Sequence, residues 1–432
     1  MQEKENGSSM LHFLKSLQFV LFVFFTIAYA YQFVYLAVGL FGKGRRGNAE
    51  AVQGRYAAVI SARNEENVIG DLIRSLKQQN YPTELLDIYV VADNCTDGTA
   101  ETAREAGATV YERFNRTQVG KGYALDYLFK LIMGDKGDSH YAGYFVFDAD
   151  NFVDPNFVLE MNKMYNGGDY AAITCYRNSK NFCSNWISAG YALWFLREAR
   201  FLNQPRAQLG VGCAVSGTGF MISGDIIREN EGWPYHLLTE DIEFSIVSAT
   251  QGWKIGYCGK AVVFDEQPTE FRQSWDQRMR WSKGFYQVDA KYTSSLLSTA
   301  VRGGKKGFSC YDMLMTVAPS NLITVCVMFI ALIVCLSGFS MPTYVTLRVL
   351  RMIGHILWTT VWGIVCSLFL FGAITMAAEW KKIDGPARRK LLYVFTFPFF
   401  MLTYVPISLA ALCGKVEWKP IRHGVAMQSK EE

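Results

Sequence analysis

The chain has 432 residues, of which half are apolar and 15% are aromatic. This composition excludes an intrinsically disordered chain, which combines few apolar residues with a high net charge. The net charge is only +4, so no concentrated basic surface points to nucleic acid as a partner. The ten cysteines include no C-x-x-C pair, which argues against a zinc or dithiol site and is typical of a reducing compartment.

Four long stretches carry no charged residue, and each is long enough to cross a bilayer, which takes about 20 apolar residues. They cover residues 16–42, 313–347, 352–378 and 391–414. We therefore predict one transmembrane helix before a long polar region and about three after it. A cleaved signal peptide, suggested by the triplet at 28–30, fits less well because the apolar run continues past it. Asp312 and Pro319 indicate that residues 308–320 lie in the membrane interface rather than across it.

Basic residues near the ends of these runs predict the orientation, because cytosolic loops are enriched in Lys and Arg. Lys43, Arg45 and Arg46 follow the first run, and five basic residues lie within 381–390. Both clusters lie in the cytosol if residues 43–310 do. With four spans, however, Arg348, Arg351 and the basic C-terminal tail would lie on the opposite side, which disagrees with the rule. We expect a multi-pass protein of the cell (plasma) membrane in three parts. These are an N-terminal transmembrane helix (1–45), a cytosolic domain ending in amphipathic interface helices (46–305), and a C-terminal membrane domain (306–432).

The polar region alternates short apolar runs with segments of helical periodicity. Strands are expected at 55–61, 87–92, 108–111 and 144–147, and helices at 66–80, 99–106 and 123–132. This order predicts an α/β fold with a mostly parallel sheet and flanking helices. Ligands of such sheets bind beyond the carboxyl ends of the strands. Polar residues follow three of the strands, and we expect them to meet in one crevice: Asn64-Glu65, Asp93 and Asp148-Ala149-Asp150. The alternative is that these strands end in ordinary polar turns.

Carboxylates, rather than a Walker A loop, are expected to dominate this crevice, since the sequence has no Walker A motif. Asp148 and Asp150 are suited to hold a divalent cation together with substrate phosphates, although a D-x-D triplet is common by chance. Lys121 either adds positive charge to the same phosphates or is a solvated loop lysine. The acidic residues at 239–241 either belong to the site or cap a helix. Residues 271–286 form an amphipathic helix that lies on the membrane surface or contributes Gln277, Arg280 and Trp281 to the site.

Together these motifs resemble the processive branch of glycosyltransferase family 2, which includes cellulose, hyaluronan and poly-N-acetylglucosamine synthases. The family signature is a lone Asp, then D-x-D, T-E-D and Q-x-x-R-W. Here it corresponds to Asp93, Asp148-Ala149-Asp150, Thr239-Glu240-Asp241 and Gln277-Arg278-Met279-Arg280-Trp281, all in order. The resemblance covers residues 52–305 and implies a GT-A type nucleotide-sugar-binding fold, a divalent metal (Mg²⁺ or Mn²⁺) and inverting transfer.

The resemblance also implies a role for each matching residue. Asn64, Glu65 and Asp93 are expected to hold the nucleoside, and Asp148 the nucleotide. Asp150, with Asp148, is expected to bind the metal, while Lys121 and Arg280 neutralise the diphosphate. Asp241 is expected to be the general base beside Glu240. Gln277, Trp281 and Gly217 are expected to line the acceptor site.

The function implied is a membrane enzyme that polymerises, and exports, a β-linked polysaccharide from a UDP-sugar, with UDP-GlcNAc or UDP-glucose favoured. Its expected partners are the donor, the growing polysaccharide, membrane lipids and accessory export proteins, with no nucleic acid. The alternative is a non-processive enzyme that adds one or a few sugars to a membrane lipid. A catalytically inactive assembly scaffold and an extracellular domain glycosylated at Asn94 or Asn115 are further alternatives. The sugar, its linkage and the oligomeric state are not determined by the sequence.

Overall fold

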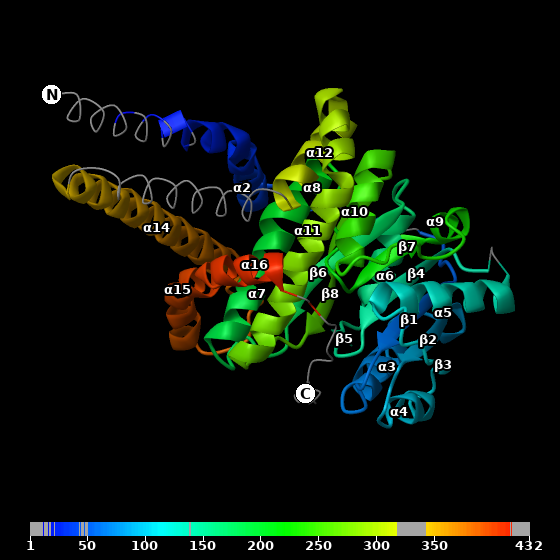
Figure 1. Ribbon diagram of the computed structural model, residues 1–432. Coiled ribbons are helices and arrows are strands. Elements are labelled where there is room, and N and C mark those ends of the chain that lie inside the picture. The colour runs from blue at the N-terminus through cyan, green and yellow to red at the C-terminus, as the bar shows by residue number, and fades with distance from the viewer. Residues whose placement is uncertain are drawn as a thin grey trace.

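The computed structural model describes residues 22–42, 51–137, 140–317 and 343–414, and the isolated positions 12, 16, 19, 20, 44, 47 and 416. A sheet covered by helices lies at one end of the molecule, and long apolar helices lie at the other (Figure 1). Within the described residues, eight strands form one sheet in the order β3-β2-β1-β4-β7-β6-β8-β5. They are β1 Tyr56–Ala62, β2 Leu86–Asp93, β3 Thr109–Arg113, β4 Gly143–Asp148, β5 Phe152–Val153, β6 Ala172–Ser179, β7 Phe220–Ser223 and β8 Ile255–Asp265.

The sheet is mixed rather than uniformly parallel. β1 pairs in parallel with β2 and β4, β2 with β3, and β6 with β8. The short strand β7 runs antiparallel to β4 and β6, and β5 runs antiparallel to β8. The predicted α/β class is thus confirmed, and the parallel part is the N-terminal half, which the strand–helix alternation had indicated. The carboxyl ends of β1, β2 and β4 meet at one edge, as expected.

Helices cover both faces of the sheet because β1 sends alternate side chains into two separate cores. Ala57 and Val59 belong to the core under α5, α7, α9 and α10, whereas Tyr56, Ala58 and Ile60 belong to the core under α3, α4 and α6. The bounds are α3 Ile69–Lys77, α4 Thr99–Glu105, α5 Lys121–Lys136, α6 Phe157–Tyr165, α7 Trp186–Glu198, α9 Gly224–Glu229 and α10 Glu240–Gln251, with a 3₁₀ turn at Thr83–Leu85.

Three further helical elements connect the sheet domain to the apolar end. α7 continues through a π-helical turn, Ala199–Asn203, into α8, Gln204–Leu209. α11 runs from Phe271 to Val301, and α12 from Gly304 to Val317. α12 packs on α10 and α11 around a buried cluster that includes Cys310 and Met313. Residues 308–317 therefore pack on α10 and α11. Whether this segment lies in a membrane interface stays a prediction, and residues 318–320 lie outside the described residues.

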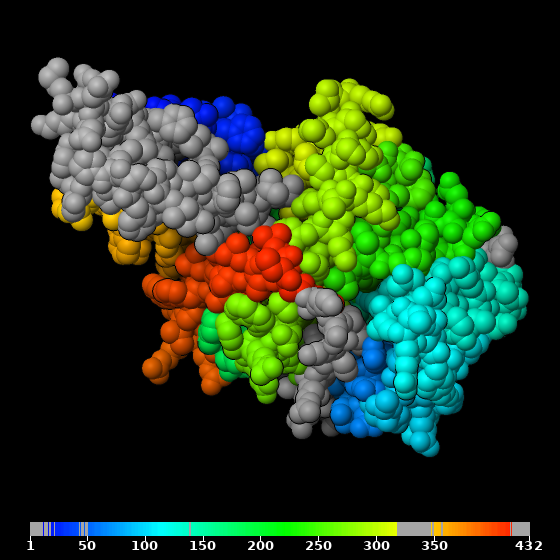
Figure 2. Space-filling model, viewed as in Figure 1, coloured from blue at the N-terminus to red at the C-terminus, as the bar shows by residue number. Residues whose placement is uncertain are grey.

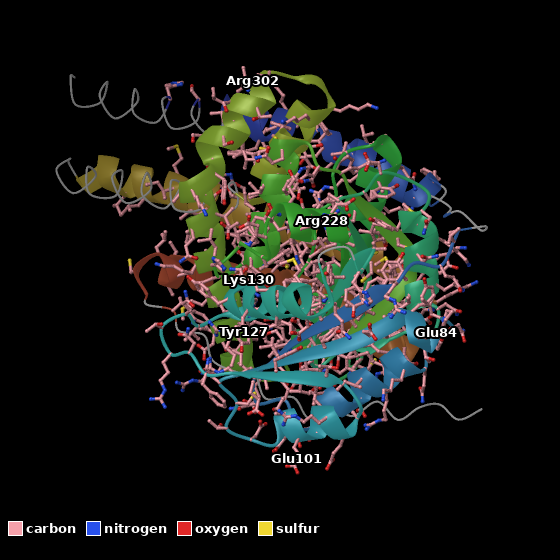
Figure 3. All side chains as sticks on the ribbon, turned by 90° about the vertical axis from the view of Figure 1, so that its right-hand side faces the viewer. Glu84, Glu101, Tyr127, Lys130, Arg228 and Arg302 are labelled. Carbon is pink, nitrogen blue, oxygen red and sulfur yellow. The ribbon has the colours of Figure 1, made fainter. Side chains whose placement is uncertain are left out.

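The apolar end contains α2 (Tyr31–Phe41), α14 (Thr343–Glu379), α15 (Ala387–Leu402) and α16 (Tyr404–Cys413). Three stretches of the described residues are long and apolar enough to cross a membrane: Phe22–Phe41, Leu350–Glu379 and Ala387–Cys413. Figure 2 shows α15, in orange, on the left and the strands and helices in cyan on the right. Charged side chains such as Glu101, Lys130 and Arg228 instead project from the sheet domain (Figure 3). This segregation supports membrane association.

Part of the predicted membrane layout falls outside the described residues. This holds for the basic cluster Lys43, Arg45 and Arg46, for most of the second apolar run (318–342) and for the C-terminal tail after 416. The four-span count, the domain boundaries at 45 and 305 and the cytosolic orientation therefore stay predictions.

The last apolar run bends at Thr403, where α15 and α16 take different directions (Figure 1). Pro406 lies three residues later and has no N–H to donate to the carbonyl of Leu402, which favours a break. The buried guanidinium of Arg278 occupies the bend and donates to the Phe400 carbonyl at 3.2 Å and to the Thr403 hydroxyl at 2.6 Å. The bend places α16 against α11, beside the cavity described next.

Candidate active site

A cavity of about 640 Å³ extends from the carboxyl ends of β1, β2 and β4 to the membrane helices. Its lining includes Asp93, Asp150 and Asp241, three acidic residues that are far apart in sequence and come from different loops. Had they faced separate regions, the enzyme hypothesis would have failed. Of the sequence-predicted residues, all but Asn64 line this cavity: Glu65, Asp93, Lys121, Asp148, Asp150, Gly217, Glu240, Asp241, Gln277, Arg280 and Trp281.

Two loops, which follow β1 and β2, form one end of the cavity and are held by hydrogen bonds. Asp93 ends β2, and its buried carboxylate accepts a hydrogen bond from the Arg113 guanidinium at 2.6 Å. Asn64 adopts a left-handed conformation (φ 59°), which Asn tolerates better than most residues. Its side-chain oxygen accepts from the backbone N–H of Thr96 at 2.8 Å and so ties the two loops together. Asn64 therefore shapes this end of the site from behind, and Glu65 is the residue that faces the cavity.

The carboxylates at β4 have the chemistry of a site for a hard divalent cation. Burial, followed by the negative charges of Asp150 and Asp148, raises the pKa of Glu65 to about 9. Such mutual repulsion is relieved when a cation binds between carboxylates. Within the described residues no three His, Cys, Asp or Glu side chains are already arranged to ligate one metal ion. Since Mg²⁺ usually takes only one or two carboxylates plus substrate phosphates, the residues present fit such an ion.

Lys121 provides the positive charge of the site. It begins α5 directly after Gly120, whose φ of 143° favours glycine. Its ammonium donates to the Asp148 carboxylate and, at 2.6 Å, to the carbonyl of Gly217. Although burial lowers the pKa of Lys121, the nearby carboxylates of Asp148 and Glu240 outweigh it, and the pKa lies above its usual value. Lys121 is thus charged and held toward the acidic residues, where a diphosphate would bind.

The acidic pair Glu240 and Asp241 begins α10 and faces the same space. The preceding Thr239 makes no side-chain capping hydrogen bond, so the arrangement is not that of a simple helix cap. Burial raises the pKa of Asp241, and burial together with Asp241 raises the pKa of Glu240 to about 7. Gly217 separates Asp241 from Asp148: a methyl group at Gly217 would lie 3.7 Å from an oxygen of the first and 3.9 Å from an oxygen of the second.

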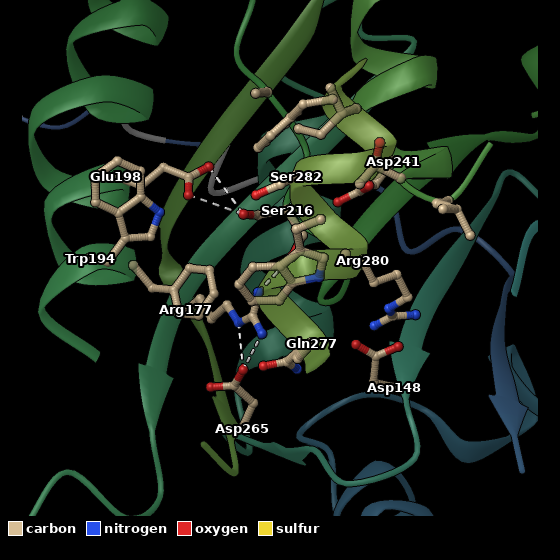
Figure 4. Close-up of a pocket in the computed structure, with 18 of the residues that line it drawn as sticks. Asp148, Arg177, Trp194, Glu198, Ser216, Asp241, Asp265, Gln277, Arg280 and Ser282 are labelled. Atoms are coloured by element: carbon tan, nitrogen blue, oxygen red, sulfur yellow. Dashed lines mark hydrogen bonds and ion pairs between the residues drawn. The ribbon is translucent and has the colours of Figure 1, made fainter. Parts of the chain in front are cut away.

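α11 forms one wall of the cavity with the residues of the Q-x-x-R-W motif. Gln277, Arg280 and Trp281 line it, and Figure 4 shows Arg280 beside Asp148 and Gln277 nearer Asp265. Burial lowers the pKa of Arg280, while Glu240 and Asp148 act in the opposite direction. The ring of Trp281 packs edge-on against Tyr191 and Phe195 of α7. The amphipathic helix is therefore part of the site and not only a membrane-surface element.

The family assignment follows from a match to the model of the family described as "Glycosyltransferase like family 2", over residues 54–284, more than half of the chain. The chain belongs to this family. The predicted enzyme class, a glycosyltransferase, is thereby confirmed, and the matched segment contains all four motifs.

Curated relatives of this glycosyltransferase are distant. The β-monoglucosyldiacylglycerol synthase of Synechocystis sp. is 26% identical over 262 residues, which are 60% of this chain and 53% of the relative. The poly-β-1,6-N-acetyl-D-glucosamine synthase of Staphylococcus epidermidis is 23% identical over 234 residues, 53% of this chain and 54% of the relative. The chain thus spans about half the length of the curated relatives it matches. The processive branch named from the motifs is not confirmed and stays a prediction.

Among solved structures, the mannosyltransferase PcManGT from Pyrobaculum calidifontis, in complex with GDP-Man and Mn²⁺, is similar in fold. Its TM-score is 0.53 at 13% sequence identity, and the match covers 92% of this glycosyltransferase and 99% of that chain. This likeness confirms the predicted GT-A type fold.

Sequence reasoning missed a second group of polar residues on the other side of the cavity (Figure 4). The Arg177 guanidinium donates to Asp265 at 2.6 Å and to the Ser216 carbonyl at 2.9 Å. Both carboxylate oxygens of Glu198 lie 3.1 Å from the Ser216 hydroxyl. Trp194 lines the cavity next to them. None of these residues belongs to a motif, and the one sequence signal was the Ser216-Gly217-Thr218-Gly219 turn.

Proposed function

We propose that this protein transfers a hexose from a UDP-sugar to a hydroxyl group of a membrane lipid, with inversion at the anomeric carbon. One observation supports the proposal most directly: a single cavity joins an end lined by acidic residues to an end lined by apolar side chains of α14, α15 and α16. UDP-glucose and UDP-GlcNAc are the favoured donors. The relatives named as monoglucosyldiacylglycerol synthases act on a lipid by name, which supports this choice.

The acidic end is suited to the donor. Glu65 and Asp93 lie where the nucleoside would bind, and Asp148 and Asp150 would hold Mg²⁺ or Mn²⁺. Such an ion, when bound, neutralises the charge that develops on the departing diphosphate. The Lys121 ammonium and the Arg280 guanidinium face the same region and add to this neutralisation. The Mn²⁺ in the complex of PcManGT supports a divalent ion.

Asp241 is the proposed general base. Its carboxylate takes the proton from the acceptor hydroxyl while the hydroxyl oxygen forms a bond to the anomeric carbon. The bond from that carbon to the diphosphate oxygen breaks on the opposite side, and UDP leaves. A single displacement turns an α-linked donor into a β-linked product and needs no covalent enzyme intermediate. Glu240 lies next to the base in the sequence. Its negative charge raises the pKa of Lys121 and so helps to keep the Lys121 ammonium protonated.

The apolar end is suited to a lipid acceptor. Past Asp241 and Trp281 the cavity is lined mainly by aliphatic and aromatic side chains from α11, α12, α14, α15 and α16. They include Phe285, Val317, Ile364, Leu368, Met401, Leu402, Val405 and Leu409. Burying acyl or prenyl chains against them is favourable at about 25 cal/mol per Å². α14 and α15 also expose apolar side chains such as Trp358 and Phe395, as expected for helices in contact with lipid.

Polymer synthesis is the second candidate, because Gln277 and Trp281 of the Q-x-x-R-W motif also line the cavity. The growing polysaccharide would then occupy the apolar end, and export proteins would be further partners. In both cases we propose a multi-pass protein of the plasma membrane with residues 51–317 on the cytosolic side, which is supported by the basic loop at 381–390.

The test uses the full-length protein in vesicles that contain diacylglycerol or a glycosylated diacylglycerol, with radiolabelled UDP-glucose or UDP-GlcNAc and Mg²⁺ or Mn²⁺. We expect a chloroform-soluble labelled lipid and loss of its formation in Asp241→Asn, by about 10²- to 10⁴-fold. Asp225→Asn, an exposed aspartate at the start of α9, is the matched control and should retain full activity. A long water-soluble polymer would support the second candidate. Full activity of Asp241→Asn would contradict both.

A further inference from the structure

One face of the helix from Trp186 to Leu209 forms a wall of the cavity. Trp194, Glu198, Leu202 and Arg206 all line it, at intervals of four residues. In a regular α-helix a four-residue step overshoots a full turn by about 40°, so such a row would drift away from the cavity. The π-helical turn at Ala199–Asn203 is wider and offsets this drift. π turns of this kind often occur at functional sites, and this one directs Glu198 and Arg206 to the same space.

Glu198 has hydrogen-bonding capacity that the side chains and backbone of the described residues leave open. Its two oxygens are equally distant, at 3.1 Å, from one hydroxyl, that of Ser216. A serine hydroxyl has one hydrogen and can donate to only one of the oxygens at a time, whereas a carboxylate accepts several hydrogen bonds. Three arginines act on Glu198 through their charge, and each has other partners. Arg177 donates to Asp265 at 2.6 Å, and Arg206 donates to Asp312 at 2.6 Å. Arg197 lies over the rings of Trp194 and Phe371.

A carboxylate in this position is costly unless further donors reach it. Burial raises the pKa of Glu198, while the Ser216 hydroxyl and the charges of Arg206 and Arg177 act in the opposite direction. Ser216 bonds Glu198, and the next residue, Gly217, lies against Asp241, since a methyl group on Gly217 would be 3.7 Å from an Asp241 oxygen. A molecule whose hydroxyl approaches Asp241 would bring its neighbouring groups toward Glu198. Two carboxylates side by side disfavour an anionic headgroup and favour uncharged hydroxyl donors.

We propose that Glu198 is an acceptor-binding residue that accepts a hydrogen bond from a second hydroxyl of the acceptor, next to the hydroxyl that attacks. The preferred acceptor is then a lipid with an uncharged headgroup that carries at least two hydroxyls, such as a sugar or another polyol. Trp194 provides an apolar surface beside this headgroup. The inference rests on the proposed function, since it concerns the acceptor end of the same cavity.

The test compares two acceptors with the same eight-carbon chain, octyl β-D-glucopyranoside, which has several hydroxyls, and 1-octanol, which has one. The full-length protein is kept in lauryldimethylamine oxide, a detergent without hydroxyl groups, and is supplied with radiolabelled UDP-glucose. We expect the wild-type protein to have the lower KM for octyl glucoside. Glu198→Gln should raise that KM about tenfold, since hydrogen bonds to charged groups are worth about a 10- to 100-fold change in binding. Its KM for 1-octanol should stay close to that of the wild type.

Two variants and one binding measurement make the result specific. Glu198→Asp keeps the charge and should restore part of the preference for octyl glucoside, while Glu229→Gln, an exposed glutamate at the end of α9, should leave both KM values unchanged. UDP affinity measured by calorimetry should be the same in all four proteins. An equal rise of both KM values in Glu198→Gln, or no rise, would overturn the inference. If neither alcohol is glycosylated while UDP release still requires Asp241, the inference fails and the proposed enzyme stands. No UDP release at all would contradict the proposed function itself.

Discussion

The buried ion pair between Arg206 and Asp312 connects three parts of the molecule that are distant in sequence. Asp312 of α12 accepts hydrogen bonds from Arg206 at 2.6 and 3.1 Å and from the hydroxyls of Tyr31 and Tyr35 of α2 at 2.9 and 3.0 Å. Both charged side chains are only 1% exposed. Within the described residues the carboxylate therefore has four donors, and only the Nη2 of Arg206 has another acceptor, the Thr316 hydroxyl at 2.9 Å.

We expect Asp312→Leu to lower the free energy of unfolding by about 3–5 kcal/mol, because it leaves the Arg206 guanidinium buried without a counter-charge. For a chain of this size that corresponds to a fall of roughly 6–10 °C in the melting midpoint, at about 2 °C per kcal/mol. Arg206→Met should also destabilise, since it leaves the carboxylate with only the two tyrosine hydroxyls. The double variant removes both charges and should cost less than Asp312→Leu alone.

The assay is thermal unfolding of the full-length protein in detergent, followed by the fluorescence of its ten tryptophans at one fixed heating rate. The matched control is Asp225→Leu, which removes an exposed aspartate from a surface ion pair and should shift the midpoint by less than about 1 °C. A fall of under about 2 °C for Asp312→Leu, or a double variant whose cost equals the sum of the two single costs, would refute the reasoning.

Three further outcomes are expected. Lys121→Met should raise the KM for the UDP-sugar about 10- to 100-fold in initial-rate measurements, because the ammonium that bonds Asp148 also faces the diphosphate site. Burial raises the pKa of Asp241 above its usual 3.8, and a general base is active only when it is deprotonated. As the pH falls, activity should therefore be lost with a midpoint above 3.8 in a pH–rate profile. A midpoint at or below 3.8 would contradict the assignment of Asp241 as the base. Gly190→Ala would place a methyl group against the ring of Phe400 and should lower the melting midpoint by roughly 2–6 °C, for a cost of about 1–3 kcal/mol.

The donor end of the cavity could be predicted from the sequence because its residues are fixed by local structure. Asp93 and Asp148 directly follow buried apolar strands, so their place in space follows from the parallel pairing of β1 with β2 and β4. Asp241 begins a helix with clear periodicity. Asn64 shows the limit of this reasoning. The sequence identified the Asn64-Glu65 turn after β1, but it could not show that Glu65 rather than Asn64 faces the cavity, because this depends on the left-handed backbone at Asn64.

The acceptor end could not be predicted because its residues are placed by contacts between distant segments. Nothing near Asp312 in the sequence indicates that its partner is Arg206, 106 residues away. Glu198 lies at the end of an apolar helix, where a charged residue is common, and its place in the cavity depends on how α7 packs on distant segments. The antiparallel strand β7 was missed because its four residues are too few to show a period.

The same ion pair also links the sheet domain to the first apolar helix, α2. Arg206 lines the cavity on the wall that carries Glu198, and it is held there by Asp312, which is held in turn by Tyr31 and Tyr35 of the first apolar helix. Without α2 the carboxylate would keep its arginine but lose the two tyrosine hydroxyls, and the wall that carries Glu198 would lose part of its support. Under the proposed function, α2 would therefore help to hold the wall that contacts the acceptor.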